Sequence, residues 1–115
     1  MNVTIYHNPA CSKSRATLTL LRERGIEPVI RLYLHEPLTV AELEDILEKL
    51  GKSPREILRT GEEAYKTLGL SEPSLTDEQL LQALAVNPIL LERPIVVVGE
   101  RAALGRPPEN VLELL

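Results

Sequence analysis

The chain has 115 residues, a net charge of −4 and a hydrophobic fraction of 43%, a composition typical of one globular domain with its own core. That core must be aliphatic, because the chain contains no Trp, no Phe and only three Tyr. The acidic balance argues against a nucleic-acid backbone as the main partner, and no apolar run of about 18 residues predicts a membrane span. The single cysteine excludes an internal disulfide and a zinc site built from several cysteines.

The first third of the chain predicts a strand, a helix and a second strand. Residues 3–6 are strand-like, residues 16–24 follow helical spacing up to Gly25, and residues 29–34 are again strand-like. A β-α-β unit of this length predicts two parallel strands joined by a right-handed crossover. Because the chain starts directly with a strand and shows no charged-then-apolar leader, we expect no signal peptide and a cytoplasmic location.

The middle third predicts a run of short helices, a helical insertion at about residues 39–87. Thr39 followed by Glu42 has the pattern of a capping box, and Thr76 followed by Gln79 repeats it. A short helix that starts with a proline and a further helical piece are expected between these two.

The last third returns to β-structure. Residues 94–98 form a strongly apolar strand, Gly99-Glu100 suits a two-residue hairpin turn, and residues 101–104 supply the return strand. Pro107-Pro108 begins a final helix. The order β-α-β, helices, β-β-α predicts an α/β fold, a thioredoxin-like mixed sheet with a helical insertion, in a single domain over residues 1–115.

Cys11 stands where the first strand gives way to the first helix. Free backbone N–H groups and the positive end of the helix dipole gather at such a point, which lowers the pKa of a thiol and holds an anion beside it. The flanking residues are polar, and His7 is close enough in sequence to stabilise a thiolate. A lone cysteine is otherwise often a small buried hydrophobe, and the residues by themselves leave both interpretations open.

Two other thiol motifs are absent. A cysteine phosphatase loop needs an arginine six positions after the cysteine, where this chain has Thr17. A dithiol redox motif needs a second cysteine at position 14, which is Ser14. A reactive Cys11 therefore could not resolve its own mixed disulfide.

Three arginines stand at the ends of predicted elements: Arg59, Arg93 and Arg106. Guanidinium groups suit tetrahedral oxyanions, which they grip through two N–H groups. From the residues alone, three unrelated surface arginines are the simpler explanation.

The segment from His7 to Arg15 resembles the active-site segment of the glutaredoxin-dependent arsenate reductases. Arg93-Pro94-Ile95-Val96-Val97 and Gly105-Arg106-Pro107-Pro108 resemble the second and third signatures of that family, and Ile57-Leu58-Arg59 also matches. Order and spacing agree over nearly the whole chain. The end at Leu115 and the Ser12-Lys13 pair after Cys11 resemble a compact chromosomal branch more than the plasmid-type enzymes.

The resemblance implies a thioredoxin-like fold and a mechanism in which Cys11 attacks arsenate and forms a thiol–arsenate ester. The other implied site residues are oxyanion-binding Arg59, Arg93 and Arg106, thiolate-stabilising His7, Ser14 and Arg15, and a cis Pro94. Glutathione is the implied co-substrate and glutaredoxin the partner that takes up the disulfide. We expect a monomer with no metal, no tightly bound cofactor and no nucleic-acid or membrane partner.

Two alternatives remain open on this scaffold. One is another glutathione-linked or glutaredoxin-linked thiol oxidoreductase, in which the arginines serve a different anion. The other is a non-enzymatic regulator similar to the Spx-type proteins, which bind RNA polymerase. Those regulators usually carry a second cysteine as a redox switch, and this chain has Ser14 there.

Overall fold

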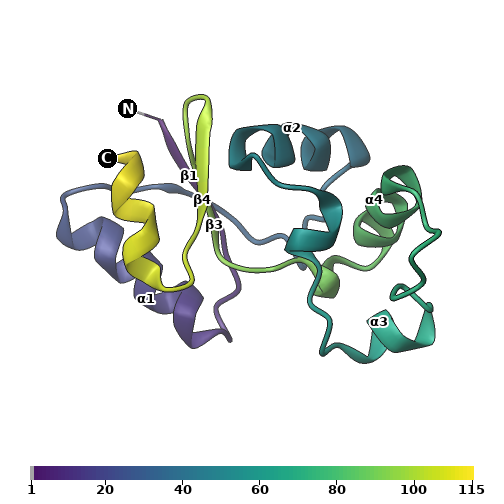
Figure 1. Cartoon of the computed structure of the whole chain (residues 1–115). Helices are drawn as coiled ribbons and strands as arrows, with labels where there is room; N and C mark the ends of the chain where they lie inside the picture. The colour runs from purple at the N-terminus through teal and green to yellow at the C-terminus, as the bar shows by residue number, and fades with distance from the viewer. Residues whose placement is uncertain (1) are drawn as a thin grey trace. The chain divides into compact units, whose positions relative to one another are not determined.

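The computed structural model describes residues 2–115, and the chain divides into two compact units (Figure 1). The first unit combines Met1–Glu36 with Arg93–Leu115, and the second is Pro37–Glu92. The helical insertion expected at about residues 39–87 falls within the second unit. None of the helices within residues 2–115 combines the length and apolarity needed to cross a membrane.

The first unit is built on a four-stranded mixed sheet with the strand order β2-β1-β3-β4. Its strands are β1 (Val3–Tyr6), β2 (Val29–Arg31), β3 (Ile95–Val98) and β4 (Arg101–Leu104). β1 runs parallel to β2 and antiparallel to β3, with Ile5 opposite Val96. β3 and β4 form a hairpin whose turn contains Gly99 at a φ of 60°, a conformation that favours glycine. The predicted thioredoxin-like mixed sheet is confirmed.

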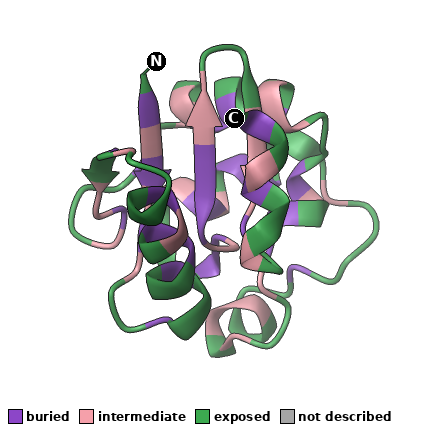
Figure 2. Cartoon of the chain, turned by 90° about the vertical axis from the view of Figure 1, so that its left-hand side faces the viewer, coloured by how far each residue is buried: buried purple, intermediate pink, exposed green. Residues whose placement is uncertain are grey.

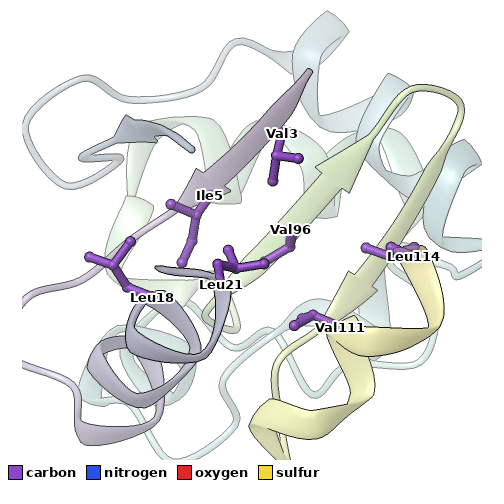
Figure 3. Close-up of a cluster of buried hydrophobic side chains, with 7 residues drawn as sticks. All are labelled: Val3, Ile5, Leu18, Leu21, Val96, Val111 and Leu114. Atoms are coloured by element: carbon purple, nitrogen blue, oxygen red, sulfur yellow. The ribbon is translucent and has the colours of Figure 1, made fainter. Parts of the chain in front are cut away.

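Two helical elements pack side by side on the sheet, α1 (Ser12–Glu23) and the 3-10 helix η3 (Pro108–Leu114). Figure 2 shows exposed residues along their outer sides. Between them and the sheet lies an aliphatic cluster of Val3, Ile5, Leu18, Leu21, Val96, Val111 and Leu114 (Figure 3). Each fully buried side chain of this size contributes about 1.5–3 kcal/mol. The cluster therefore holds α1 firmly on the sheet, and with it the residue that precedes α1, Cys11.

The second unit is helical. Its elements are α2 (Val40–Leu50), η1 (Pro54–Ile57), α3 (Glu63–Thr67), α4 (Asp77–Val86) and η2 (Pro88–Leu90). Both predicted capping boxes are confirmed: Glu42 N donates to Thr39 Oγ1 at 3.1 Å, and Gln79 N donates to Thr76 Oγ1 at 3.2 Å. α2 packs against α4 through leucine-rich buried faces.

Three element boundaries differ from the sequence-based expectation. The second strand was expected to reach residue 34 but ends at Arg31, because the N–H groups of His35 and Glu36 both bond the Leu32 carbonyl and turn the chain. The first helix begins at Ser12, since Cys11 is extended and acts as its N-cap. The last helix is a 3-10 helix, with i to i+3 bonds such as Asn110 N to Pro107 O at 3.0 Å.

Candidate active site

Cys11 is the N-cap residue of α1. Its backbone is extended, with φ −97° and ψ 125°, and its carbonyl accepts a helical hydrogen bond from Arg15 N at 3.0 Å. The N–H groups of Lys13 and Ser14 have no acceptor inside the helix and act on the Cys11 side chain, where they lower the pKa of its thiol. The side chain is only 9% exposed, but the groups around its sulfur are polar.

The environment of Cys11 favours the thiolate. Burial by itself raises the pKa of the thiol. The backbone N–H groups of Ser14 and Lys13 and the guanidinium group of Arg93 oppose the effect of burial and together lower the pKa of the thiol below its ordinary value. A larger share of the Cys11 thiol is therefore ionised at neutral pH than in a free cysteine.

A tight turn sets the direction from which the chain enters Cys11. Asn8 organises this turn: its carbonyl accepts from Cys11 N and its Oδ1 accepts from Ala10 N, each at 3.0 Å. Arg15 Nη1 donates to the Pro9 carbonyl at 2.8 Å and so stabilises the same turn. The role expected for Arg15 at the thiolate stays a prediction, and its hydrogen bond to Pro9 places it beside the loop that carries the sulfur.

His7 and Ser14 form a buried pair behind this turn. The His7 Nδ1 and Ser14 Oγ atoms lie 2.6 Å apart, and Ser14 Oγ also accepts from Asn8 N at 3.0 Å. Burial, and then the charges of Arg22 and Arg15, lower the pKa of His7, so the ring is neutral at neutral pH. Its predicted effect on the Cys11 thiolate stays a prediction.

Two of the three predicted arginines lie in the same unit as Cys11. Arg93 lies two residues before the start of β3, and its guanidinium group is close enough to Cys11 to lower the pKa of the thiol. Arg106 is exposed, and its Nη1 donates to the Arg93 carbonyl at 3.4 Å. The Arg93–Pro94 peptide bond is cis, the form that the family resemblance implies. The structure thus brings Arg93 to Cys11 and the Arg106 guanidinium to the Arg93 backbone, whereas the predicted contact of Arg106 with an oxyanion stays a prediction.

Arg59 belongs to the second unit, where it is held by neighbours of its own. Its Nη2 forms an ion pair with Glu62 Oε1 at 2.8 Å, and its Nη1 donates to the Ile89 carbonyl at 3.3 Å. The side chain of Arg59 is only 20% exposed. Its approach to the Cys11 site stays a prediction.

The structure adds two features that sequence reasoning missed. The Arg106–Pro107 peptide bond is also cis. Gly105 lies against Thr17 of α1, a contact for which no local pattern in the sequence gives a signal.

The charges of the two units have opposite signs. Residues 1–36 and 93–115 carry eight Lys or Arg against six Asp or Glu, whereas residues 37–92 carry five against eleven. The acidic balance of the whole chain therefore belongs to the second unit, and the unit that contains Cys11 suits an anion. Within residues 2–115, no three His, Cys, Asp or Glu side chains gather closely enough to hold a metal ion.

The sequence and the structure both match known proteins over nearly the whole chain. Residues 6–114 match the model of the ArsC family. An uncharacterized Escherichia coli K12 protein, YfgD, is 54% identical over 98% of this chain and 96% of its own length. An arsenate reductase from Haemophilus influenzae is 50% identical over the full length of both chains. The solved structure of an arsenate reductase from Vibrio cholerae superposes with a TM-score of 0.98 at 49% identity, covering 100% of this chain and 98% of the other.

Proposed function

Since this chain belongs to the ArsC family, we propose that it is an arsenate reductase that uses Cys11 as its nucleophile. The observation that carries the proposal is the environment of the sulfur. A helix N-terminus and the Arg93 guanidinium both favour the thiolate of Cys11. The same positive groups that stabilise a thiolate also attract a tetrahedral oxyanion to its side.

The proposed first step is attack of the Cys11 thiolate on the arsenic atom of arsenate. A sulfur–arsenic bond forms, and one arsenate oxygen leaves as water after protonation. Arg93 and Arg106 would neutralise the remaining oxyanion charge, and Arg59 is proposed as a third oxyanion-binding residue. His7, Ser14 and Arg15 would support the thiolate, Ser14 through its N–H and Arg15 through the turn at Pro9.

The proposed second step needs a thiol from outside the chain. A glutathione sulfur and the Cys11 sulfur are joined in one disulfide, and the two electrons released reduce As(V) to As(III), which leaves as arsenite. Glutaredoxin then reduces the mixed disulfide and regenerates Cys11. A chain with one cysteine has no resolving thiol of its own, and this supports the assignment of both external reductants. The proposed cycle requires the reducing conditions of the cytoplasm.

The test is an arsenate reduction assay with glutathione and glutaredoxin supplied separately and together. We expect arsenite only when both are present, and none from the Cys11→Ser variant. Arg93→Gln should raise the KM for arsenate and lower kcat, because it weakens both oxyanion binding and the thiolate. Arg101→Gln is the matched control, since Arg101 is an exposed residue of the same unit whose guanidinium bonds the Glu113 carbonyl at 2.8 Å.

Two results would refute the proposal. Normal turnover by Cys11→Ser would remove the nucleophile from the mechanism. No arsenite under any reductant, together with glutathione-dependent turnover of disulfide substrates by the wild-type protein, would identify a different thiol oxidoreductase on the same scaffold.

A further inference from the structure

We propose that Gly105 is a positioning residue that sets the spacing between Cys11, Arg93 and Arg106. The proposal concerns the assembly of the site, and it rests on the proposed function only where arsenate kinetics are used to test it. It starts from a close contact between three segments of the first unit that are far apart in the sequence.

Position 105 needs a glycine because the structure leaves no room there for a side chain. It is buried, and its φ lies outside the left-handed region, so other residues could adopt its backbone conformation. A Cβ added at Gly105 would lie 2.5 Å from Thr17 Oγ1 and 2.7 Å from Pro94 Cγ. Both distances are far shorter than a van der Waals contact, so either the side chains or the segments that carry them would have to move apart.

The side chains of Thr17 and Pro94 have little room to move away from an added methyl group. Thr17 is completely buried, and its Oγ1 donates to the Lys13 carbonyl at 2.8 Å. Its branched Cβ further restricts rotation about χ1. Pro94 is also fully buried, and its ring has little freedom. An added methyl group would therefore displace backbone, because the side chains around it have no other place to go.

Each of the three segments carries one group of the candidate site. Thr17 stands on α1, one turn after Lys13 and Ser14, whose N–H groups lower the pKa of the Cys11 thiol. Pro94 follows Arg93, and its carbonyl accepts from Gly105 N at 2.9 Å.

Arg106 follows Gly105 directly in the chain, and its guanidinium reaches the Arg93 carbonyl at 3.4 Å. The close packing of the Gly105 backbone against Thr17 and Pro94 thus determines how near the segments of Arg93 and Arg106 come to α1, the helix that follows Cys11.

The test uses Gly105→Ala, with Gly61→Ala as the matched control. A Cβ at Gly61 meets nothing within 4 Å, and its φ also lies outside the left-handed region. The readout is the rate of Cys11 alkylation by iodoacetamide against pH, which requires no arsenate. We expect Gly105→Ala to move the inflection about one pH unit toward that of free cysteine, because Arg93 moves away from the sulfur. Gly61→Ala should leave the inflection unchanged.

A second pair of variants separates positioning from general loss of stability. Thr17→Ala removes the atom closest to the added methyl group, so Gly105→Ala in the Thr17→Ala background should shift the inflection less than it does in the wild type. The two backgrounds together form a double-mutant cycle. If Gly105→Ala does not fold, the double variant compared with Thr17→Ala alone gives the same measurement, and a higher inflection in the double variant supports the proposal.

An unchanged inflection in Gly105→Ala accompanied only by a lower melting temperature would overturn the proposal, since it would show a structural role without an effect on the site. An equal shift in both backgrounds would overturn it too. In the arsenate arm, Gly105→Ala should lose roughly 100-fold in kcat/KM, the usual effect of displacing reacting groups by about 1 Å. If the wild-type protein does not reduce arsenate but the alkylation shift is found, the proposed function fails and the positioning role stands.

Discussion

Replacing Ser14 with alanine separates the stability of the site from the acidity of its sulfur. Ser14 is completely buried, and its hydroxyl bonds both His7 Nδ1 and Asn8 N. Alanine would leave these two polar groups without that oxygen, and each buried group that loses its hydrogen bond costs about 1–3 kcal/mol. Because the Asn8 bond is only partly buried, we expect a total loss of roughly 2–4 kcal/mol in the free energy of unfolding.

Urea unfolding followed by far-UV circular dichroism measures this loss, since the chain has no tryptophan for fluorescence. For a slope typical of small domains, the midpoint should fall by about 1–2 M urea. Ser12→Ala is the matched control: Ser12 is an exposed serine in the first turn of the same helix, and its replacement should change stability by no more than about 0.5 kcal/mol.

The Cys11 alkylation profile of Ser14→Ala supplies the second measurement. The Ser14 N–H, which lowers the pKa of the Cys11 thiol, is retained in alanine, so the inflection should stay near its wild-type position while stability falls. Equal stability of Ser14→Ala and Ser12→Ala would refute the buried hydrogen-bond argument. A large shift of the inflection at unchanged stability would show that the hydroxyl itself acts on the sulfur.

Three further predictions concern charge, pH and packing. Arg93→Gln should raise the alkylation inflection of Cys11 by about one pH unit, and an unchanged inflection would contradict the contact between the two residues. Folding lowers the pKa of His7 from 6.5. The stability that this ring contributes should therefore be complete above pH 6.5 and lost as the pH falls through the lower pKa of the folded state. Urea midpoints at several pH values test this prediction, and a midpoint independent of pH would disprove it. Leu21→Ala, at a completely buried position, should cost about 2–5 kcal/mol, whereas Val29→Ala, at a residue 67% exposed, should stay within about 0.5 kcal/mol; similar urea midpoints for the two would argue against the packing described for the core.

Features that depend on neighbouring residues could be predicted from the sequence. The capping boxes at Thr39 and Thr76, the turn at Gly99 and the position of Cys11 before a helix are all set by residues within a few positions of one another. The prediction that the second strand continues to residue 34 was wrong because a hydrogen-bonded turn, which the local pattern does not show, ends the strand. Its apolar residues continue, but a turn closed by Leu32 ends the strand, and periodicity does not reveal such a turn.

Features that depend on distant residues were harder to predict. The sequence indicated Arg93 and Arg106 as separate element-end arginines, and only the pairing of β1 with β3 and of β3 with β4 brings their segments to Cys11. The contact of Gly105 with Thr17 is likewise created by packing across the sheet. The family resemblance supplied the grouping of these residues, and the folded chain supplies the physical reason for it.

The position of Cys11 as the N-cap residue of α1 has a consequence for the direction of the proposed redox chemistry. The positive end of the helix favours a negatively charged sulfur, so it stabilises the reduced, ionised form over any form in which the sulfur is covalently bound. In the proposed cycle, the same preference would make the Cys11 sulfur a good leaving group when an outside thiol attacks a mixed disulfide at this position. The first turn of the helix would then favour the return of the protein to its starting state.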